Sequence, residues 1–284
     1  MELWKALRRR RLAMGGAAVI ALLVAVGIGG PWIAPYDPLA QDLSKSLLGP
    51  SWEHWFGTDS FGRDILSRVL YGARISLLVG VASQGIAFAL GVLLGVVSGY
   101  YGGKIESLVM RLADVTLAFP TLLLLIAITA AFQPSLVVVF VAIGVVGWAG
   151  IARLVRSQTL VVRELDFVQA ARALGMGDAR LLLRHVLPNT LAPAIIAVTL
   201  GMAGAILLEA ALSFIGLGAQ PPTPSWGSMI SDGRDFLRTA PWISVFPGLA
   251  IGVVVLGFNL FGDGLRDAMD PRLRGRARAL PRPE

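Results

Sequence analysis

Long apolar runs separated by short polar segments dominate the chain. A bilayer core about 30 Å thick is crossed by roughly 20 apolar residues in a helix. Six runs of this kind predict an all-α polytopic membrane protein with six transmembrane helices, of which we expect the fourth to be short. The approximate ranges are 14–34, 75–99, 109–131, 135–151, 192–213 and 242–262.

The basic residues predict how these helices are oriented. All but six of the 25 lysine and arginine residues fall in the two terminal tails or in the second and fourth connections. Cytoplasmic segments are enriched in these residues, so we expect those four segments, and both termini, in the cytoplasm. An even number of spans is then required, and six satisfies it. We interpret the net charge of +7 as a sign of topology, not of nucleic-acid binding.

The first apolar run follows a basic start, so a cleaved signal peptide is an alternative to a membrane anchor. The run is longer than the roughly 7–15 apolar residues of a signal peptide, and no small-x-small cleavage site precedes Pro35. We therefore expect an uncleaved transmembrane helix.

The composition excludes several kinds of chemistry. The chain is 55% hydrophobic and only 15% charged, and it has no cysteine. Disulfides, thiolate catalysis and iron–sulfur ligation are therefore excluded. His54 and His185 are far apart in the sequence, so a histidine-based zinc site is not expected.

A nucleotide-binding P-loop is also missing. That motif ends in Gly-Lys-Ser/Thr, whereas Lys104, the lysine that follows a glycine here, is followed by Ile105. We expect no ATPase site, no enzymatic activity and no cofactor on this chain. If ATP drives its function, ATP and Mg²⁺ bind to a partner.

The polar connection at about 152–191 is predicted to form two short cytoplasmic helices. The first covers roughly 165–174 and is ended by Gly175 and Gly177, because glycine is a poor interior residue and a good C-terminal stop. The second covers about 179–186. We expect Asp178 to cap it and Pro188 to end it.

The first of these helices has a surface almost bare of side chains, made by Ala170, Ala171 and Ala173. Such a surface lets another protein approach closely. The alternative is an amphipathic helix that lies on anionic lipid, with its arginines at the headgroups. The residues alone leave both interpretations open.

This stretch resembles the EAA loop of ABC-transporter permease subunits, which reads Glu-Ala-Ala, three residues, Gly, nine residues and Ile-x-Leu-Pro. Gln169 replaces the glutamate and His185 the isoleucine. The matching positions are Ala170, Ala171, Gly175, Leu187 and Pro188. The resemblance implies a coupling helix that sits in a cleft of a cytoplasmic ATPase. Because Gln169 only forms hydrogen bonds, the resemblance does not extend to a charge pair there.

Other stretches resemble the C-type permeases of dipeptide, oligopeptide and nickel importers. They lie at 54–77, 110–120, 209–218 and 259–274. The resemblance covers nearly the whole chain and implies an ATP-driven importer of peptides or a related solute, with nickel complexes or sugars as alternatives. Transport would proceed by alternating access.

The resemblance also implies the partners and the location. The partners are a second homologous permease, two P-loop ATPase subunits, an external solute-binding protein and membrane lipid. The location is the cytoplasmic (inner) membrane of a bacterium or archaeon. We expect residues 1–74 to hold the first span and an external segment, and 75–284 to form a core with five spans and the coupling loop.

Four charged residues precede the second predicted span: Asp59, Arg63, Asp64 and Arg68. Asp64 and Arg68 stand in the favourable i,i+4 order for an ion pair. Apolar residues of 64–74 share one helical face, which predicts an amphipathic helix on the outer membrane surface. We favour an interfacial anchor over a substrate-binding role.

Two acids fall within predicted spans, Asp114 and Glu209. An intramembrane carboxylate is costly and marks a candidate functional site. Both lie near span ends, where water or headgroups solvate a charge, so we favour interfacial or structural pairing over a proton relay.

Glycines recur at four-residue spacing in the second span, at Gly91, Gly95 and Gly99. A ridge of small residues lets two helices approach closely. We favour helix packing over a pore-lining role for this ridge.

Three other classes of protein compete with the importer. An ion-coupled secondary carrier often has inverted repeats and charges at the midplane of the membrane, and no clear repeat is present. A membrane-embedded enzyme needs a catalytic constellation, and none has convincing spacing. A channel is not separated by composition, but only the importer gives the EAA-like loop a function.

Overall fold

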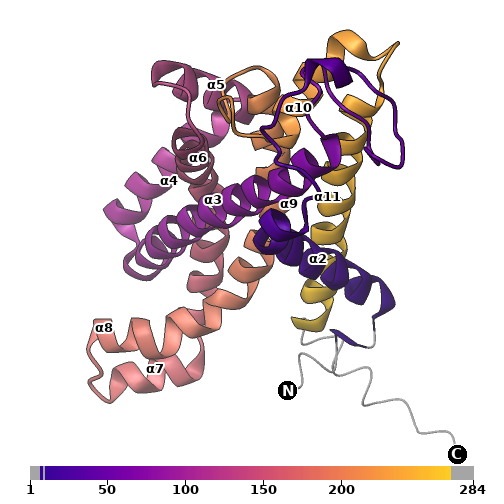
Figure 1. Cartoon of the computed structure of the whole chain (residues 1–284). Coiled ribbons are helices and arrows are strands. Elements are labelled where there is room, and N and C mark those ends of the chain that lie inside the picture. The colour runs from indigo at the N-terminus through magenta and orange to yellow at the C-terminus, as the bar shows by residue number, and fades with distance from the viewer. Residues whose placement is uncertain (1–6, 9, 270–284) are drawn as a thin grey trace, which may run out of the picture.

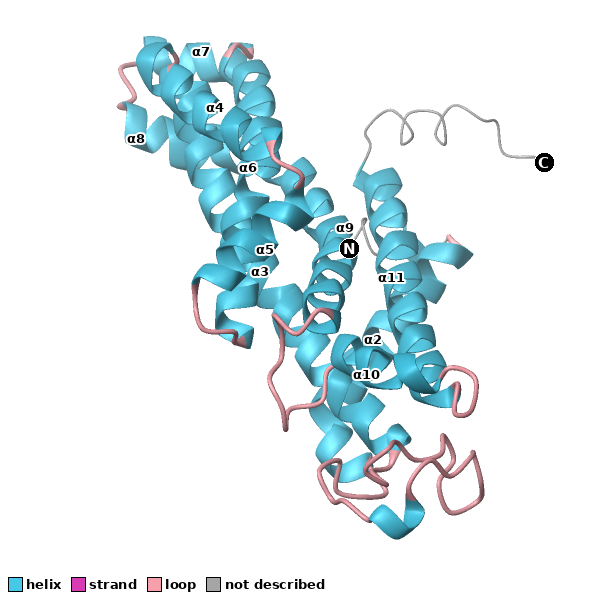
Figure 2. Ribbon diagram, turned by 90° about the horizontal axis from the view of Figure 1, so that it is seen from above, coloured by secondary structure: helices cyan, strands magenta, loops and turns pink. Residues whose placement is uncertain are grey.

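The computed structural model describes residues 7–8 and 10–269, and within them all regular structure is helical (Figure 2). Two short 3₁₀ turns, Leu43–Lys45 and Arg234–Phe236, lie between the helices. The α-helices are α2 (Arg11–Ile33), α3 (Ile65–Tyr101), α4 (Gly103–Ala118), α5 (Thr121–Ala131), α6 (Leu136–Arg163), α7 (Asp166–Ala173), α8 (Asp178–Leu181), α9 (Leu187–Phe214), α10 (Trp226–Gly233) and α11 (Trp242–Met269).

Within the described part of the chain, five helical segments are long and apolar enough to cross a membrane. They are α2, α3, α6, α11 and the unit from α8 to α9, which runs from Asp178 to Phe214. The number becomes six if α4 and α5 together form one span.

The third predicted span, 109–131, is not a single helix. It is divided between α4 and α5, which meet at an angle of 93°. The break falls at Phe119 and Pro120, where the backbone of Phe119 is extended (φ −86°, ψ 140°). Proline disfavours the helical conformation of the residue before it and has no N–H to donate. The third apolar run therefore forms two helices, not the single transmembrane helix expected.

Two other spans are longer than predicted. The second begins at Ile65, not at residue 75, so α3 runs through the expected division at 74/75. The fourth ends at Arg163, not at residue 151. Arginines do not end α6 because Arg153 and Arg156 pair with acids on α4.

The glycine ridge of α3 lies against α6. Added Cβ atoms at Gly91, Gly95 and Gly99 would all lie under 3.0 Å from atoms of α6. At Gly95 the nearest atoms would be the carbonyl oxygen of Ala152, at 2.7 Å, and the Cβ of Val155, at 2.8 Å. The predicted packing role of the ridge is confirmed.

The two ends of the molecule carry different elements (Figure 1). The α7 and α8 helices project from one end, and α10 lies at the other, together with the loop 34–64 that joins α2 to α3. The loop is held there by Phe56, which stacks on Phe246 of α11 with ring centroids 4.0 Å apart. The indole N–H of Trp242 also donates to the carbonyl of Thr58, at 3.2 Å.

We predict that Gly95→Ala destabilises the protein by about 1–3 kcal/mol, because the extra methyl group overpacks the α3–α6 contact. Thermal unfolding in detergent measures the effect. Gly85→Ala is the matched control on the same helix, since nothing lies within 4 Å of an added Cβ there. Equal unfolding temperatures for the two variants would refute this account of the contact.

Candidate functional site

The first site residues lie in residues 166–186, which we call the α7–α8 segment. As the glycine pattern predicts, α7 ends just before Gly175. Gly175 has a φ of +79°. Its N–H donates to the carbonyl of Arg172 at 3.0 Å, and the N–H of Met176 donates to the carbonyl of Ala171 at 3.2 Å. This pair of bonds is a Schellman motif, which glycine favours because it has no Cβ. The turn therefore has a defined shape.

Two local expectations about the second helix were wrong. Asp178 is the first residue of α8 and makes no capping bond. Its carboxylate instead accepts a hydrogen bond from the hydroxyl of Tyr100, at 2.6 Å, which ties α8 to the end of α3. Pro188 does not end the helix either. It lies in the first turn of α9, where its missing N–H costs nothing, and a π-helical turn, Leu182–Val186, joins α8 to α9.

The α7–α8 segment has its own small core. Val168, Leu181 and Val186 are fully buried beside Tyr100 of α3 and Val162 of α6. Ala171 is 8% exposed, so it lies on the inner side of α7. The bare outer surface predicted for all three alanines is therefore formed by the other two.

The exposed part of this segment combines small and apolar side chains. Ala170 and Ala173 are exposed, and Leu174 at the tip is 89% exposed. We call these three residues the tip surface. The tip surface therefore presents one large apolar side chain and two small ones to its surroundings.

The two positions that depart from the EAA pattern face inward. The side-chain amide of Gln169 donates to the carbonyl of Arg163 at 2.9 Å, so it fastens α7 to the last residue of α6. A carboxylate has no hydrogen to donate there. His185 is partly buried near Phe167, with ring centroids 6.1 Å apart, and Leu187 begins α9.

Asp114 belongs to a row of charges between α4 and α6. It is exposed and pairs with Arg153. One turn nearer the α7–α8 end, Arg156 donates from Nε to Glu106 at 2.7 Å. Together with Arg111 these side chains line an open groove of about 480 Å³.

Glu209 is fully buried, so the expected solvation by water or headgroups was wrong. Its Oε1 accepts a hydrogen bond from the hydroxyl of Ser213 at 2.6 Å. The same hydroxyl accepts from the backbone N–H of Ala219 at 3.1 Å. Glu209 therefore holds the turn that follows α9, and it faces the interior of the chain.

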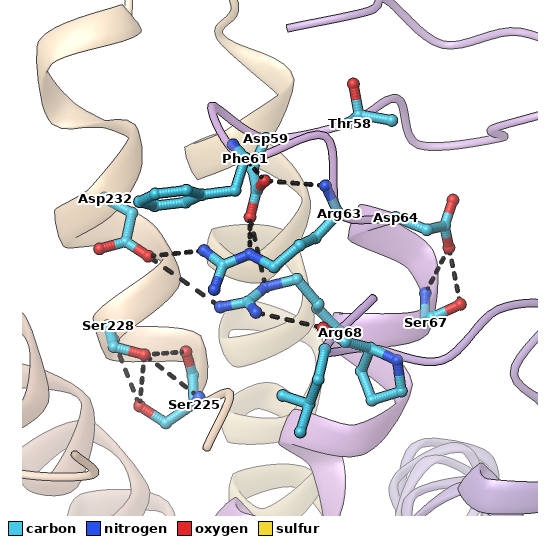
Figure 3. A network of polar contacts seen from close by, with 12 residues as sticks. Thr58, Asp59, Phe61, Arg63, Asp64, Ser67, Arg68, Ser225, Ser228 and Asp232 are labelled. Atoms are coloured by element: carbon cyan, nitrogen blue, oxygen red, sulfur yellow. Dashed lines mark hydrogen bonds and ion pairs between the residues drawn. The ribbon is translucent and has the colours of Figure 1, made fainter. Parts of the chain in front are cut away.

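The charged residues around the start of α3 form a buried cluster at the α10 end (Figure 3). Asp59 accepts from Nε of Arg63 at 2.7 Å and lies 3.6 Å from Nε of Arg68. Asp232 of α10 approaches both guanidinium groups, at 3.6 and 4.0 Å. Partial burial raises the pKa of the Asp232 carboxyl, and Arg68 and Arg63 oppose that shift.

Asp64 does not pair with Arg68 as the i,i+4 spacing suggested. Its carboxylate caps α3 by accepting from the N–H of Ser67 at 2.8 Å, and it lies 2.9 Å from Nδ1 of His54. Ser67 and Arg68 are buried as well as the apolar Ile65 and Val69, so protein covers the polar face that an amphipathic surface helix would expose. The placement of residues 64–74 on the outer membrane surface stays a prediction.

Sequence reasoning missed the residues that complete these clusters. Tyr100 and Asp232 pair with residues far away in the chain, and His54 pairs with Asp64 across a non-helical loop, so no helical spacing signals them. Arg153 and Arg156 carried a usable signal, because two basic residues three apart lie on one face of a helix and can meet acids on a neighbouring helix. Among the described residues, no group of three or more His, Cys, Asp or Glu side chains is placed to hold a metal ion.

The apolar helices define a polytopic membrane protein, and comparison with known proteins identifies its family. Residues 91–275 match the family described as binding-protein-dependent transport system inner membrane component. Residues 1–50 match the N-terminal transmembrane domain of oligopeptide transport permease C. The chain belongs to the family of binding-protein-dependent inner membrane transport components.

Two curated relatives are similar over nearly their whole length. The dipeptide transport system permease protein DppC of Alkalihalophilus pseudofirmus is 48% identical over 96% of this chain and 90% of its own. The glutathione transport system permease protein GsiD of Escherichia coli is 47% identical, over 96% of this chain and 91% of its own.

Two solved structures share the fold. A chain of the inward-facing MetNI methionine ABC transporter has a TM-score of 0.60 at 18% identity, covering 72% of this chain and 98% of that one. A chain of an amino acid ABC transporter crystallised with histidines has a TM-score of 0.55 at 16% identity, covering 70% and 92%. The protein is thus a multi-pass inner-membrane permease subunit, and in this family the ATPase activity belongs to partner subunits.

We predict that Arg68→Gln destabilises the protein by about 3 kcal/mol, the lower end for breaking a buried ion pair, because Arg63 still faces Asp59. Combining it with Asp232→Asn costs less than the sum of the two single losses, since the interaction between Arg68 and Asp232 is already absent in Arg68→Gln. Thermal unfolding of the four proteins in this cycle gives the coupling. Arg234→Gln, at an exposed pair with Asp235, is the control and has little effect. Strictly additive losses in the cycle would contradict the cluster.

Proposed function

We propose that this chain is the membrane-spanning permease subunit of an ATP-driven importer that brings small peptides into the cytoplasm. The observation that carries the proposal is the α7–α8 segment, a rigid projection with an exposed tip surface at the position of the EAA-like sequence. The named substrates of the relatives, dipeptides and glutathione, support peptides as the solute.

The proposed topology has six spans, with α4 and α5 together forming the third. Both termini then lie on the side of α7 and α8, which we assign to the cytoplasm. Arg172, Arg180 and Arg184 of that segment support the assignment, because basic residues concentrate on the cytoplasmic side. The α10 end faces outward, toward the external solute-binding protein.

The proposed assembly contains this chain, a second homologous permease, two P-loop ATPase subunits and the external binding protein. ATP and Mg²⁺ bind to the ATPase subunits. Within this chain, residues 1–74 and 75–284 correspond to the N-terminal part and the core of the permease. The family, whose members depend on a binding protein, supports this composition.

Coupling follows from how the α7–α8 segment is anchored. Its core includes Tyr100 and Val162, which lie at the ends of α3 and α6. The hydrogen bonds from Tyr100 to Asp178 and from Gln169 to Arg163 fasten it further. A displacement of the segment by a docked ATPase therefore moves α3 and α6, which supports transport by alternating access.

Ala170→Trp is expected to uncouple the ATPase from transport. The bulky side chain occupies the tip surface without entering the core, so uptake falls about tenfold or more, as for the loss of an interface hot spot, while the thermal stability of the chain is retained. Peptide uptake and ATP hydrolysis, measured together in proteoliposomes of the whole importer, give the coupling ratio.

Ala171→Trp is the matched comparison, because Ala171 is buried and a large side chain there disrupts the core of the segment. It should lower thermal stability, whereas Ala170→Trp should not. Wild-type uptake per ATP in the Ala170→Trp importer would count against docking at the tip surface.

The solute assignment predicts that deleting this chain abolishes uptake of radiolabelled dialanine by cells that express the rest of the importer. Restoring the chain restores uptake, because no other subunit supplies these spans. Uptake of labelled nickel and of a labelled disaccharide, measured in parallel, should not depend on the chain. If uptake of either solute depends on the chain and uptake of dialanine does not, the solute is not a peptide.

A further inference from the structure

The groove between α4 and α6 is lined by charged and polar side chains that the packing of the two helices does not require. α4 has three faces. Val109 and Ala113 are buried against α6, and Leu108 and Leu112 belong to an exposed apolar face. The third face lines the groove with its charged and polar residues: Glu106, Ser107, Arg111 and Asp114.

The charges of the groove do not balance. Glu106 pairs with Arg156 and Asp114 pairs with Arg153. Arg111, in contrast, has no ion-pair or hydrogen-bond partner among residues 7–8 and 10–269. The groove therefore presents one positive charge in excess, to which an anionic ligand is complementary.

The position of the groove indicates that it faces water. It lies on α4, the helix that ends at the break before α5, where both Phe119 and Pro120 are exposed. Backbone without helical hydrogen bonds is tolerated at membrane depth only where protein covers it or a water-filled cavity adjoins it. An unpaired arginine is likewise costly in hydrocarbon. This side of α4 is thus unsuited to lipid and suited to a solute path.

We propose that the groove between α4 and α6 is a subsite for the free carboxylate of the transported peptide on the cytoplasmic half of its path. The inference rests on the proposed function and adds the residues that contact the solute. Arg111 binds the carboxylate, and the exposed Arg153 next to it offers a second donor. The volume of about 480 Å³ lies within the range of roughly 300–1,000 Å³ that is common for small-ligand pockets.

Asp114 gives the groove a means to accept both ends of a zwitterion. Its side chain is 63% exposed even while it pairs with Arg153, so an ammonium group can approach it from the groove. A dipeptide places its two charges a few bonds apart, which matches a groove that carries both signs. Dipeptides and glutathione share the free carboxylate, so both are compatible with Arg111.

Because the chain has no cysteine, a single one placed in the groove reports directly on its occupancy. Ser107→Cys lines the groove, and Leu108→Cys on the apolar face of α4 is the matched control. The full importer, in inside-out membrane vesicles, is treated with an anionic methanethiosulfonate reagent. The rate of modification of this chain is then followed by mass spectrometry, with and without dialanine.

We expect the reagent to modify Ser107→Cys, and dialanine to slow that reaction. Alanyl-alanine amide, which lacks the carboxylate, should give no protection. Adding Arg111→Gln should raise the dialanine concentration needed for half-protection about tenfold or more, as for the loss of one charged hydrogen bond. Lys104→Gln, at an exposed cation outside the groove, should not change that concentration.

Several results would overturn the inference. One is a groove cysteine that the reagent does not reach although it reaches Leu108→Cys, because a partner subunit or lipid then covers the groove. Another is equal protection by dialanine and its amide, or protection that survives Arg111→Gln. In either case the charged residues only hold α4 and α6 together. Dialanine uptake by the intact cells from which the inside-out vesicles are prepared separates the subsite from peptide import. Normal uptake without protection refutes the subsite alone, whereas absent uptake refutes peptide import and the subsite with it.

Discussion

The close approach of α3 and α6 is the contact on which the rest of the structure depends. It exists because Gly91, Gly95 and Gly99 present no side chain to α6. Both helices end at the α7–α8 segment, where Arg163 donates to the carbonyl of Gly99 at 2.8 Å and Tyr100 donates to Asp178. The α7–α8 segment and the helices α3 and α6 are therefore joined as one unit.

The same contact places the charged groove. α6 carries Arg153 and Arg156 past the point where an isolated span would end, and α4 lies beside it with two acids. Since α6 also leads directly into α7, a motion of the α7–α8 segment would reach the side chains of the groove through one helix. The break at Pro120 separates α4 from α5, and the residues that line the groove come from α4 and α6. In this account, coupling and solute handling share α6.

The sequence predicted the elements whose cause is local and missed those whose cause is distant. Apolar length gave the helices, the four-residue glycine spacing gave the α3–α6 contact, and Gly175 gave the end of α7. The end of the fourth span was wrong because its arginines are neutralised by acids on another helix. Asp64 and Arg68 have the right spacing for an ion pair. Asp64 instead accepts a hydrogen bond from the N–H of Ser67 at the N-terminus of α3, and Arg68 faces Asp232, which is far away in the chain. Local sequence spacing does not show which of several possible partners a charged residue binds.

A photo-crosslinker on a single cysteine at Leu174 tests the central claim most directly, because this exposed side chain ends the projecting segment. The chain has no native cysteine to compete. In native membranes, mass spectrometry should identify the captured partner as a P-loop ATPase of the same importer, and ATP should change the yield. Capture of lipid alone from Leu174, and likewise from Ala170 and Ala173, would contradict the account and leave the segment as a helix on the membrane surface.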